Sequence, residues 1–86
     1  MNGSFLLFQT LLLLTALTKG NQNIQKIIAF ENGFDRVIQI IESEGFSDGG
    51  PIVEDSLHLF LNLLKGNTSN QTFFREGTRF FMSYEF

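Results

Sequence analysis

The chain has 86 residues, of which 43% are hydrophobic and 17% are charged, and this composition is typical of one small globular domain. Its formal net charge is −3 and no cluster of Lys and Arg occurs, which argues against a nucleic-acid interface. It contains no cysteine, so it has neither a disulfide framework nor a thiolate metal site, as is usual in a reducing compartment.

The apolar run near the N-terminus allows two interpretations. The segment FLLFQTLLLLTAL, from Phe5 to Leu17, has the length and apolar character of a signal-peptide core. However, no Lys or Arg precedes it, polar residues interrupt it, and it is too short to span a bilayer as a helix. We therefore expect a core helix over about 5–18. A secreted protein remains the alternative, because three glycosylation sequons begin at Asn2, Asn67 and Asn70.

Four further helices are predicted downstream, and no segment alternates clearly enough to predict a strand. Their expected ranges are about 22–31, 34–44, 51–65 and 70–76. The first can be capped by Asn21 and is expected to face inward through Ile24, Ile27 and Ile28. The second is expected to bury Phe34, Val37, Ile38 and Ile41. Residues 45–50 read as a loop, Gly77 as an interruption, and 78–86 as a divergent, aromatic-rich end.

The helix over Pro51–Lys65 is the best-defined element of the chain. Pro51 suits a first helical turn, and Gly66 can take the left-handed conformation that ends a helix. At about 100° per residue, its apolar residues form two adjacent stripes. One contains Val53, Leu57, Phe60, Leu61 and Leu64, and the other Ile52, Leu59 and Leu63. Together they cover roughly 200° of the circumference, so we expect this helix to be packed on two sides and Leu57 to be buried.

The chain also contains an internal repeat. The segment LTKGN at 17–21 matches LLKGN at 63–67, so the offset between Gly20 and Gly66 is 46 residues (66 − 20 = 46). The same offset aligns Leu13 with Leu59 and Gln25 with Gln71. A period near 40–47 residues, with two or three helices per unit, is typical of armadillo and HEAT repeats. We therefore predict an all-α, armadillo-like right-handed helical solenoid of about two repeats without caps. This prediction also weakens the signal-peptide interpretation, because the two long helices are then counterparts.

Two polar residues of the 51–65 helix are candidate site residues. His58, the sole histidine, lies on the polar side near Glu54 and Asp55, so a general base or metal ligand can be imagined there; an ordinary surface histidine is the simpler interpretation. Asn62 lies where armadillo proteins often bind the backbone of an extended peptide, although its repeat counterpart is Ala16, so a solvated residue is the alternative. We expect no catalytic residue, no cofactor and no metal site, and we retain Asn62 and His58 as possible protein-binding residues.

The C-terminal aromatic residues could form a partner site, or could be the exposed side of an incomplete repeat. They are Phe73, Phe74, Phe80, Phe81, Tyr84 and Phe86. The incomplete repeat is the interpretation that we favour.

The sequence from Leu14 to Gly77 resembles the armadillo-like globular head of the general vesicular transport factors, the Uso-type Golgi vesicle tethers. The resemblance is carried by three segments, NIQKIIAFENGF at 23–34, EGFSDGGPIVED at 44–55 and NLLKGNTSNQTFFREG at 62–77. It covers most of the chain and is specific, because the three segments occur together in order. The sequence departs from the family pattern over 78–86, so we expect residues 1–86 to be a fragment of such a head domain.

The resemblance implies a non-enzymatic protein-interaction scaffold. In this family the head acts in docking of transport vesicles between the endoplasmic reticulum and the Golgi. The implied location is the cytoplasm, peripheral on the Golgi membrane. The implied partners are a Rab-type GTPase, golgins and the SNARE fusion machinery. The family is homodimeric through a coiled coil that this chain lacks.

Overall fold

The structure, a computed structural model, describes residues 3–44 and 50–85, and it places side chains within 5–44 and 50–77. The described residues form helices and no strands, which confirms the predicted all-α class. The helices are α1 (Gly3–Thr18), α2 (Gln22–Phe30), α3 (Gly33–Ser43), α4 (Pro51–Leu64) and α5 (Thr68–Glu85). The expected ranges of the first four agree with these bounds to within two residues.

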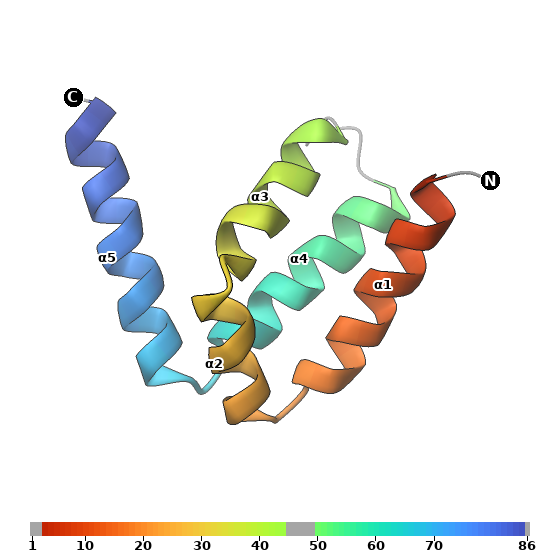
Figure 1. The fold of residues 1–86 in the computed structure, drawn as a ribbon, viewed down its shortest axis with the longest axis horizontal. Coiled ribbons are helices and arrows are strands. Elements are labelled where there is room, and N and C mark those ends of the chain that lie inside the picture. Colours follow the sequence, from red (N-terminus) through yellow and green to blue (C-terminus); the bar gives the residue numbers. More distant parts are fainter. Residues whose placement is uncertain (1–2, 45–49, 86) are drawn as a thin grey trace.

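The two long helices α1 and α4 lie side by side and run in the same direction (Figure 1). Their contact is the most extensive between any two of the helices described here. The shorter helices α2 and α3 pack across α4, and α5 leaves the end of α4 and extends along the other side of α2 (Figure 1). The arrangement confirms that the segments 5–18 and 51–65 are neighbouring helices.

The turns that follow α1 and α4 have the same geometry, as the repeat in the sequence predicts. Gly20 and Gly66 have φ values of +66° and +67°, in the left-handed region that glycine adopts without steric cost. The next residue in each turn is an asparagine, Asn21 or Asn67, and each caps the helix that follows. The side chain of Asn21 accepts a hydrogen bond from the amide of Ile24 at 3.2 Å. The side chain of Asn67 accepts one from the amide three residues later at 3.0 Å.

A glutamine in the following helix closes each turn in the same way. Gln25 Nε2 donates to the carbonyl oxygen of Thr18 at 2.6 Å. Gln71 Nε2 donates to the carbonyl oxygen of Leu64 at 2.8 Å. Both bonds span seven residues and both accept at the last residue of a long helix. Positions 46 residues apart therefore share equivalent hydrogen bonds as well as similar residues.

The core lies between α1, α4 and the pair α2–α3. Its buried residues come from all four helices and are Leu11, Ala29, Phe34, Val37, Ile41, Leu59 and Leu63. Three of the four residues predicted to be buried on α3 are buried, and the fourth, Ile38, is partly buried. The expected inward position of α1 is confirmed at Leu11, so this apolar segment is a packed helix of the fold. None of the helices within the described residues is long and apolar enough to cross a membrane.

Three residues that were predicted to be buried are exposed. Ile27 is exposed, because α2 turns Gln25 and Ala29 toward the core and the bond from Gln25 to Thr18 fixes this orientation. Leu57 and Leu61, which belong to one predicted stripe of α4, are also exposed, because the helices packed against α4 leave this part of its circumference uncovered. Within the described residues α4 is nevertheless packed on two sides, as expected, by α1 on one side and by α2, α3 and the start of α5 on the other (Figure 1).

The last helix is longer than expected. The sequence predicts a helix over 70–76 and an interruption at Gly77, but α5 continues through Gly77 to Glu85. One glycine in a helix interior is unfavourable by only about 1 kcal/mol relative to alanine, which is too little to end a helix by itself. The predicted loop lies at 45–50, of which 45–49 are outside the described residues, as are Asn2 and the side chains of 78–86.

Candidate interaction surfaces

A cluster of buried polar side chains joins the two repeat turns, and we refer to it as the polar joint. It consists of Thr18, Gln25, Asn67 and Asn70, each of which is at most 2% exposed. Asn67 Nδ2 donates to Gln25 Oε1 at 2.9 Å. Asn70 Nδ2 donates to the carbonyl oxygens of Gln25 at 3.0 Å and Leu63 at 2.8 Å. Buried amides that are paired in this way fix the position of α2 against the start of α5.

The polar joint makes the asparagines of two of the three glycosylation sequons inaccessible to solvent. A glycan would be attached to the side-chain nitrogen of Asn67 or Asn70, and both nitrogens are buried and hydrogen-bonded. The folded chain leaves no space or free nitrogen for the sugar at either position. The structure therefore argues against the secreted, glycosylated alternative at Asn67 and Asn70; the third sequon begins at Asn2, outside the described residues.

The candidate residue Asn62 lies on the side of α4 that meets α1. Its Nδ2 donates to the carbonyl oxygen of Thr15 at 3.0 Å and to Thr18 Oγ1 at 3.3 Å, and the residue is partly buried. It is therefore not the solvated residue of the simpler interpretation. A peptide bound through this amide nitrogen would have to displace the bond to α1, and peptide binding by Asn62 stays a prediction.

The candidate residue His58 is exposed on α4, one turn before Asn62. Glu54 precedes it by one turn on the same side of the helix and is also exposed. Within 3–44 and 50–85, no three His, Asp or Glu side chains come together in a way that could hold a metal ion. Its surroundings are those of a surface residue that a protein partner could contact.

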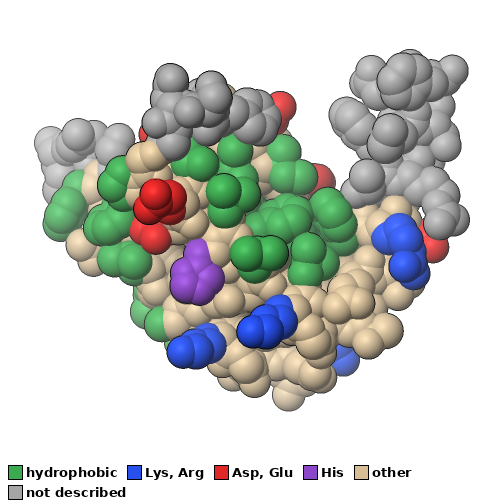
Figure 2. All heavy atoms as spheres, turned by 180° about the vertical axis from the view of Figure 1, so that it is seen from behind, with side chains coloured by type: hydrophobic (Ala, Val, Ile, Leu, Met, Phe, Trp, Pro, Cys, Tyr) green, Lys and Arg blue, Asp and Glu red, His purple; other side chains and the backbone are tan. Residues whose placement is uncertain are grey.

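Leucines on the outer sides of the long helices form two apolar surfaces. The α1 outer face consists of Leu6, Leu13 and Leu17, and the α4 outer face consists of Leu57 and Leu61; all five are exposed. Figure 2 shows apolar side chains gathered in a hollow beside the histidine, and others along the edge that α1 forms. Exposed apolar clusters of this kind on a small chain are typical of protein–protein contacts.

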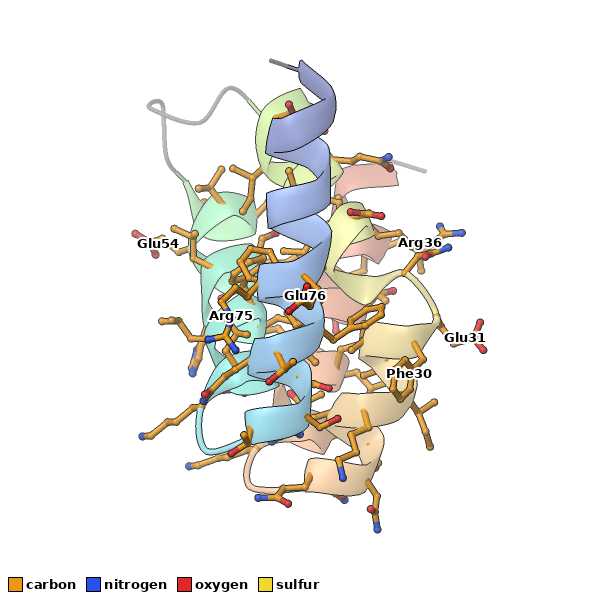
Figure 3. All side chains as sticks on the ribbon, turned by 90° about the vertical axis from the view of Figure 1, so that its left-hand side faces the viewer. Phe30, Glu31, Arg36, Glu54, Arg75 and Glu76 are labelled. Atoms are coloured by element: carbon orange, nitrogen blue, oxygen red, sulfur yellow. The ribbon has the colours of Figure 1, made fainter. Side chains whose placement is uncertain are left out.

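The aromatic residues at the start of α5 pack within the fold. Phe74 lies 4.9 Å from Phe34 and 5.1 Å from Phe60, measured between ring centroids. Phe73 lies 5.2 Å from Phe30, which Figure 3 shows on α2 beside α5. Figure 3 also shows the charged side chains of Glu31, Arg36 and Glu54 pointing outward at the margins. The two phenylalanines of α5 thus hold this helix against α2, α3 and α4, although Phe73 remains partly open to solvent.

No protein-family model matches the chain. Among curated proteins, a segment of a human protein is 63% identical to it over 67 residues, which are 78% of this chain. That protein is the general vesicular transport factor p115. The match confirms the resemblance found in the sequence. The yeast intracellular protein transport protein USO1 from Saccharomyces cerevisiae is also similar, 48% identical over 68 residues, or 79% of this chain. Golgin candidate 6 of Arabidopsis thaliana is 49% identical over 49 residues, or 57% of this chain.

The chain spans only a small part of these relatives. The matched residues are 7% of human p115, 4% of yeast USO1 and 5% of golgin candidate 6. The names of the first two describe vesicular and intracellular protein transport, which supports a role of this chain in vesicular transport. The features that this chain adds to such a role are the buried polar joint and the exposed α1 and α4 outer faces.

Sequence reasoning missed the polar joint. The sequence patterns indicate Asn67 and Asn70 only as a cap and as sequons, and Gln25 only as a member of the repeat. The signal that could have found the joint is nevertheless present, because glutamines recur at 25 and 71 four residues after the asparagines at 21 and 67. Polar residues that recur at a fixed place in a repeat indicate a hydrogen bond that each repeat needs.

Proposed function

We propose that residues 1–86 are part of a non-enzymatic protein-interaction scaffold in a vesicle-tethering factor. The observation that carries this proposal is the 63% identity to a segment of human p115 over 67 residues. The scaffold would act in ER-to-Golgi and intra-Golgi transport, where it would dock vesicles before fusion. It would work in the cytoplasm, peripheral on the Golgi membrane.

We further propose that the chain is a portion of an armadillo-like, right-handed helical solenoid, and that the whole of 1–86 belongs to one such head domain. Support comes from the matching turns at Gly20 and Gly66 and from the side-by-side packing of α1 and α4. In a solenoid each repeat contacts the repeats before and after it. The open leucines on the outer sides of α1 and α4 are then the surfaces that such neighbours cover.

The proposed partners are proteins: a Rab-type GTPase, golgins and the SNARE machinery, with dimerisation through a coiled coil elsewhere in the longer protein. On this chain, His58 is the proposed contact residue, because α4 exposes its imidazole one turn after the exposed Glu54. Asn62 would contribute only if its bond to Thr15 were exchanged for one to the partner.

A segment exchange tests the proposal. The corresponding segment of human p115 is replaced by this chain, and the chimera is expressed in cells depleted of p115. We expect transport of a secreted reporter to be restored to a level close to that with unaltered p115. A matched chimera with Leu59→Asp, which places a charge in the core, should fail. A well-folded, equally abundant chimera that restores no transport would contradict the proposed function.

A further inference from the structure

Residues 46 positions apart occupy equivalent places on α1 and α4, and in several such pairs one residue is exposed and the other is buried. Leu13 on α1 is 59% exposed, whereas Leu59, its counterpart 46 residues later, is 1% exposed. In the other direction, Leu57 on α4 is 49% exposed, whereas its counterpart Leu11 is 2% exposed. Each long helix thus leaves open the side that the other buries inside the chain.

The other members of the two outer faces follow the same pattern, although Ile52, the counterpart of the exposed Leu6, is only partly buried. Leu17 is exposed and its counterpart Leu63 is fully buried. Leu61 is exposed, and its counterpart Thr15 lies in the contact with α4, where its carbonyl accepts the bond from Asn62. The α4 outer face therefore corresponds to the surface that α1 presents to α4, and the α1 outer face corresponds to the surface that α4 buries.

We propose that the α1 outer face of one copy of this chain docks on the α4 outer face of a second copy. In this contact the incoming α1 takes the position, relative to the first copy's α4, that α4 takes relative to α1 within each chain. The contact is head-to-tail, so each copy keeps one face open and can bind a further copy in series. This association is a property of the chain itself and does not depend on the proposed role in transport.

The charge distribution is compatible with such a contact between the long helices. The segment from Gly3 to Thr18 carries no charged residue, so it brings no like charge toward Glu54 or Lys65, which border the α4 outer face. The correspondence ends on α5, where Arg75 stands in the place of the buried Ala29. The docking surface is therefore confined to α1 and α4.

Sedimentation velocity of the full 86-residue chain over a concentration series tests the proposal. We expect the wild-type chain to form dimers and longer species as concentration rises. Leu13→Glu and Leu57→Glu should each raise the apparent Kd by roughly a hundredfold or more, because each would bury an unpaired carboxylate in the contact. Ile27→Glu is the matched control, since Ile27 is exposed but lies outside both faces, and it should leave the Kd unchanged.

Mixing the two variants distinguishes a head-to-tail contact from other kinds of association. The Leu13→Glu chain keeps an intact α4 outer face and the Leu57→Glu chain keeps an intact α1 outer face. An equimolar mixture should therefore form dimers, and no longer species, although each variant alone stays monomeric. Circular dichroism at 222 nm checks that both variants remain helical. If either loses helix, Leu13→Gln and Leu57→Gln replace them, with the same pattern and about a tenfold effect.

Three results would overturn the proposal. A wild-type chain that stays monomeric at all concentrations would mean that these faces serve only another occupant, such as flanking segments of a longer protein. A loss of association in one variant but not the other would indicate a symmetric contact of like faces. A mixture that does not restore dimers would indicate non-specific association.

Discussion

Replacing the two equivalent glutamines separately tests whether the polar joint stabilises the fold. Gln25→Ala removes the bond from Nε2 to Thr18 and the bond that Oε1 accepts from Asn67. Each buried hydrogen bond contributes about 1 kcal/mol net, and a buried N–H left without a good acceptor costs about 1 kcal/mol more. Asn67 Nδ2 would keep only its bond of 3.3 Å to the carbonyl of Gln22. We therefore expect Gln25→Ala to lower the free energy of unfolding by about 2–4 kcal/mol.

Gln71→Ala is the internal control, because it removes a hydrogen bond of the same type and sequence spacing in the second turn. Gln71 is exposed, so water can replace the lost bond, and we expect a loss of about 0.5 kcal/mol. Urea unfolding followed by circular dichroism at 222 nm, at one low concentration for all chains, measures both values. A domain of this size has a total stability of only about 4–13 kcal/mol, so the difference should be easily seen. Equal losses in the two variants would refute the conclusion that Gln25 is held in a buried polar joint while Gln71 is exposed.

Three further predictions concern packing, and each compares positions whose surroundings differ. In urea unfolding, Leu59→Ala should lower the free energy of unfolding by about 3 kcal/mol, because Leu59 is buried, and exposed Leu57→Ala should lower it by less than about 1 kcal/mol. A larger loss for Leu57→Ala than for Leu59→Ala would contradict the assignment of Leu59 to the buried side of α4. Gly33→Ala should be strongly destabilising, because a Cβ there would lie 2.5 Å from the carbonyl oxygen of Ile28. Gly77→Ala should instead raise the melting temperature slightly, because alanine is more favourable than glycine inside a helix and nothing lies near its Cβ. A Gly33→Ala chain as stable as the wild type would show that α2 and α3 are not so close. Asn70→Asp keeps the shape but replaces a donor with a charge facing two carbonyls, and should abolish folded signal at neutral pH in circular dichroism.

Much of the fold could be predicted from local features of the sequence. Glycines, asparagines and the single proline mark helix ends, and for this reason the turns at Gly20 and Gly66 can be recognised from their residues alone. The repeat could be predicted because LTKGN and LLKGN are short, matched and correctly spaced. These signals depend on a few neighbouring residues, which a single sequence displays.

The buried sides of α2 and α4 could not be predicted fully in the same way, although that of α3 could. Leu57 and Leu59 are both leucines on one apolar helix, and only the position of α1, α2 and α3 decides that Leu59 is covered and Leu57 is not. On α2 a glutamine, Gln25, is buried together with Ala29, because its two hydrogen bonds compensate for burial, while Ile27 faces outward. Hydrophobicity alone cannot show a polar residue that is buried with its partners.

Residues 3–18 and 51–64 are equivalent helices packed side by side. The most direct test is a nuclear Overhauser spectrum of the isotopically labelled chain, read at the side-chain amide protons of Asn62. These protons belong to a nitrogen 3.0 Å from the carbonyl oxygen of Thr15 and 3.3 Å from Thr18 Oγ1, so we predict cross-peaks to protons of both threonines. An Asn62 amide that shows cross-peaks only to its own helix and to water would contradict the packing of α1 on α4 and the repeat derived from it.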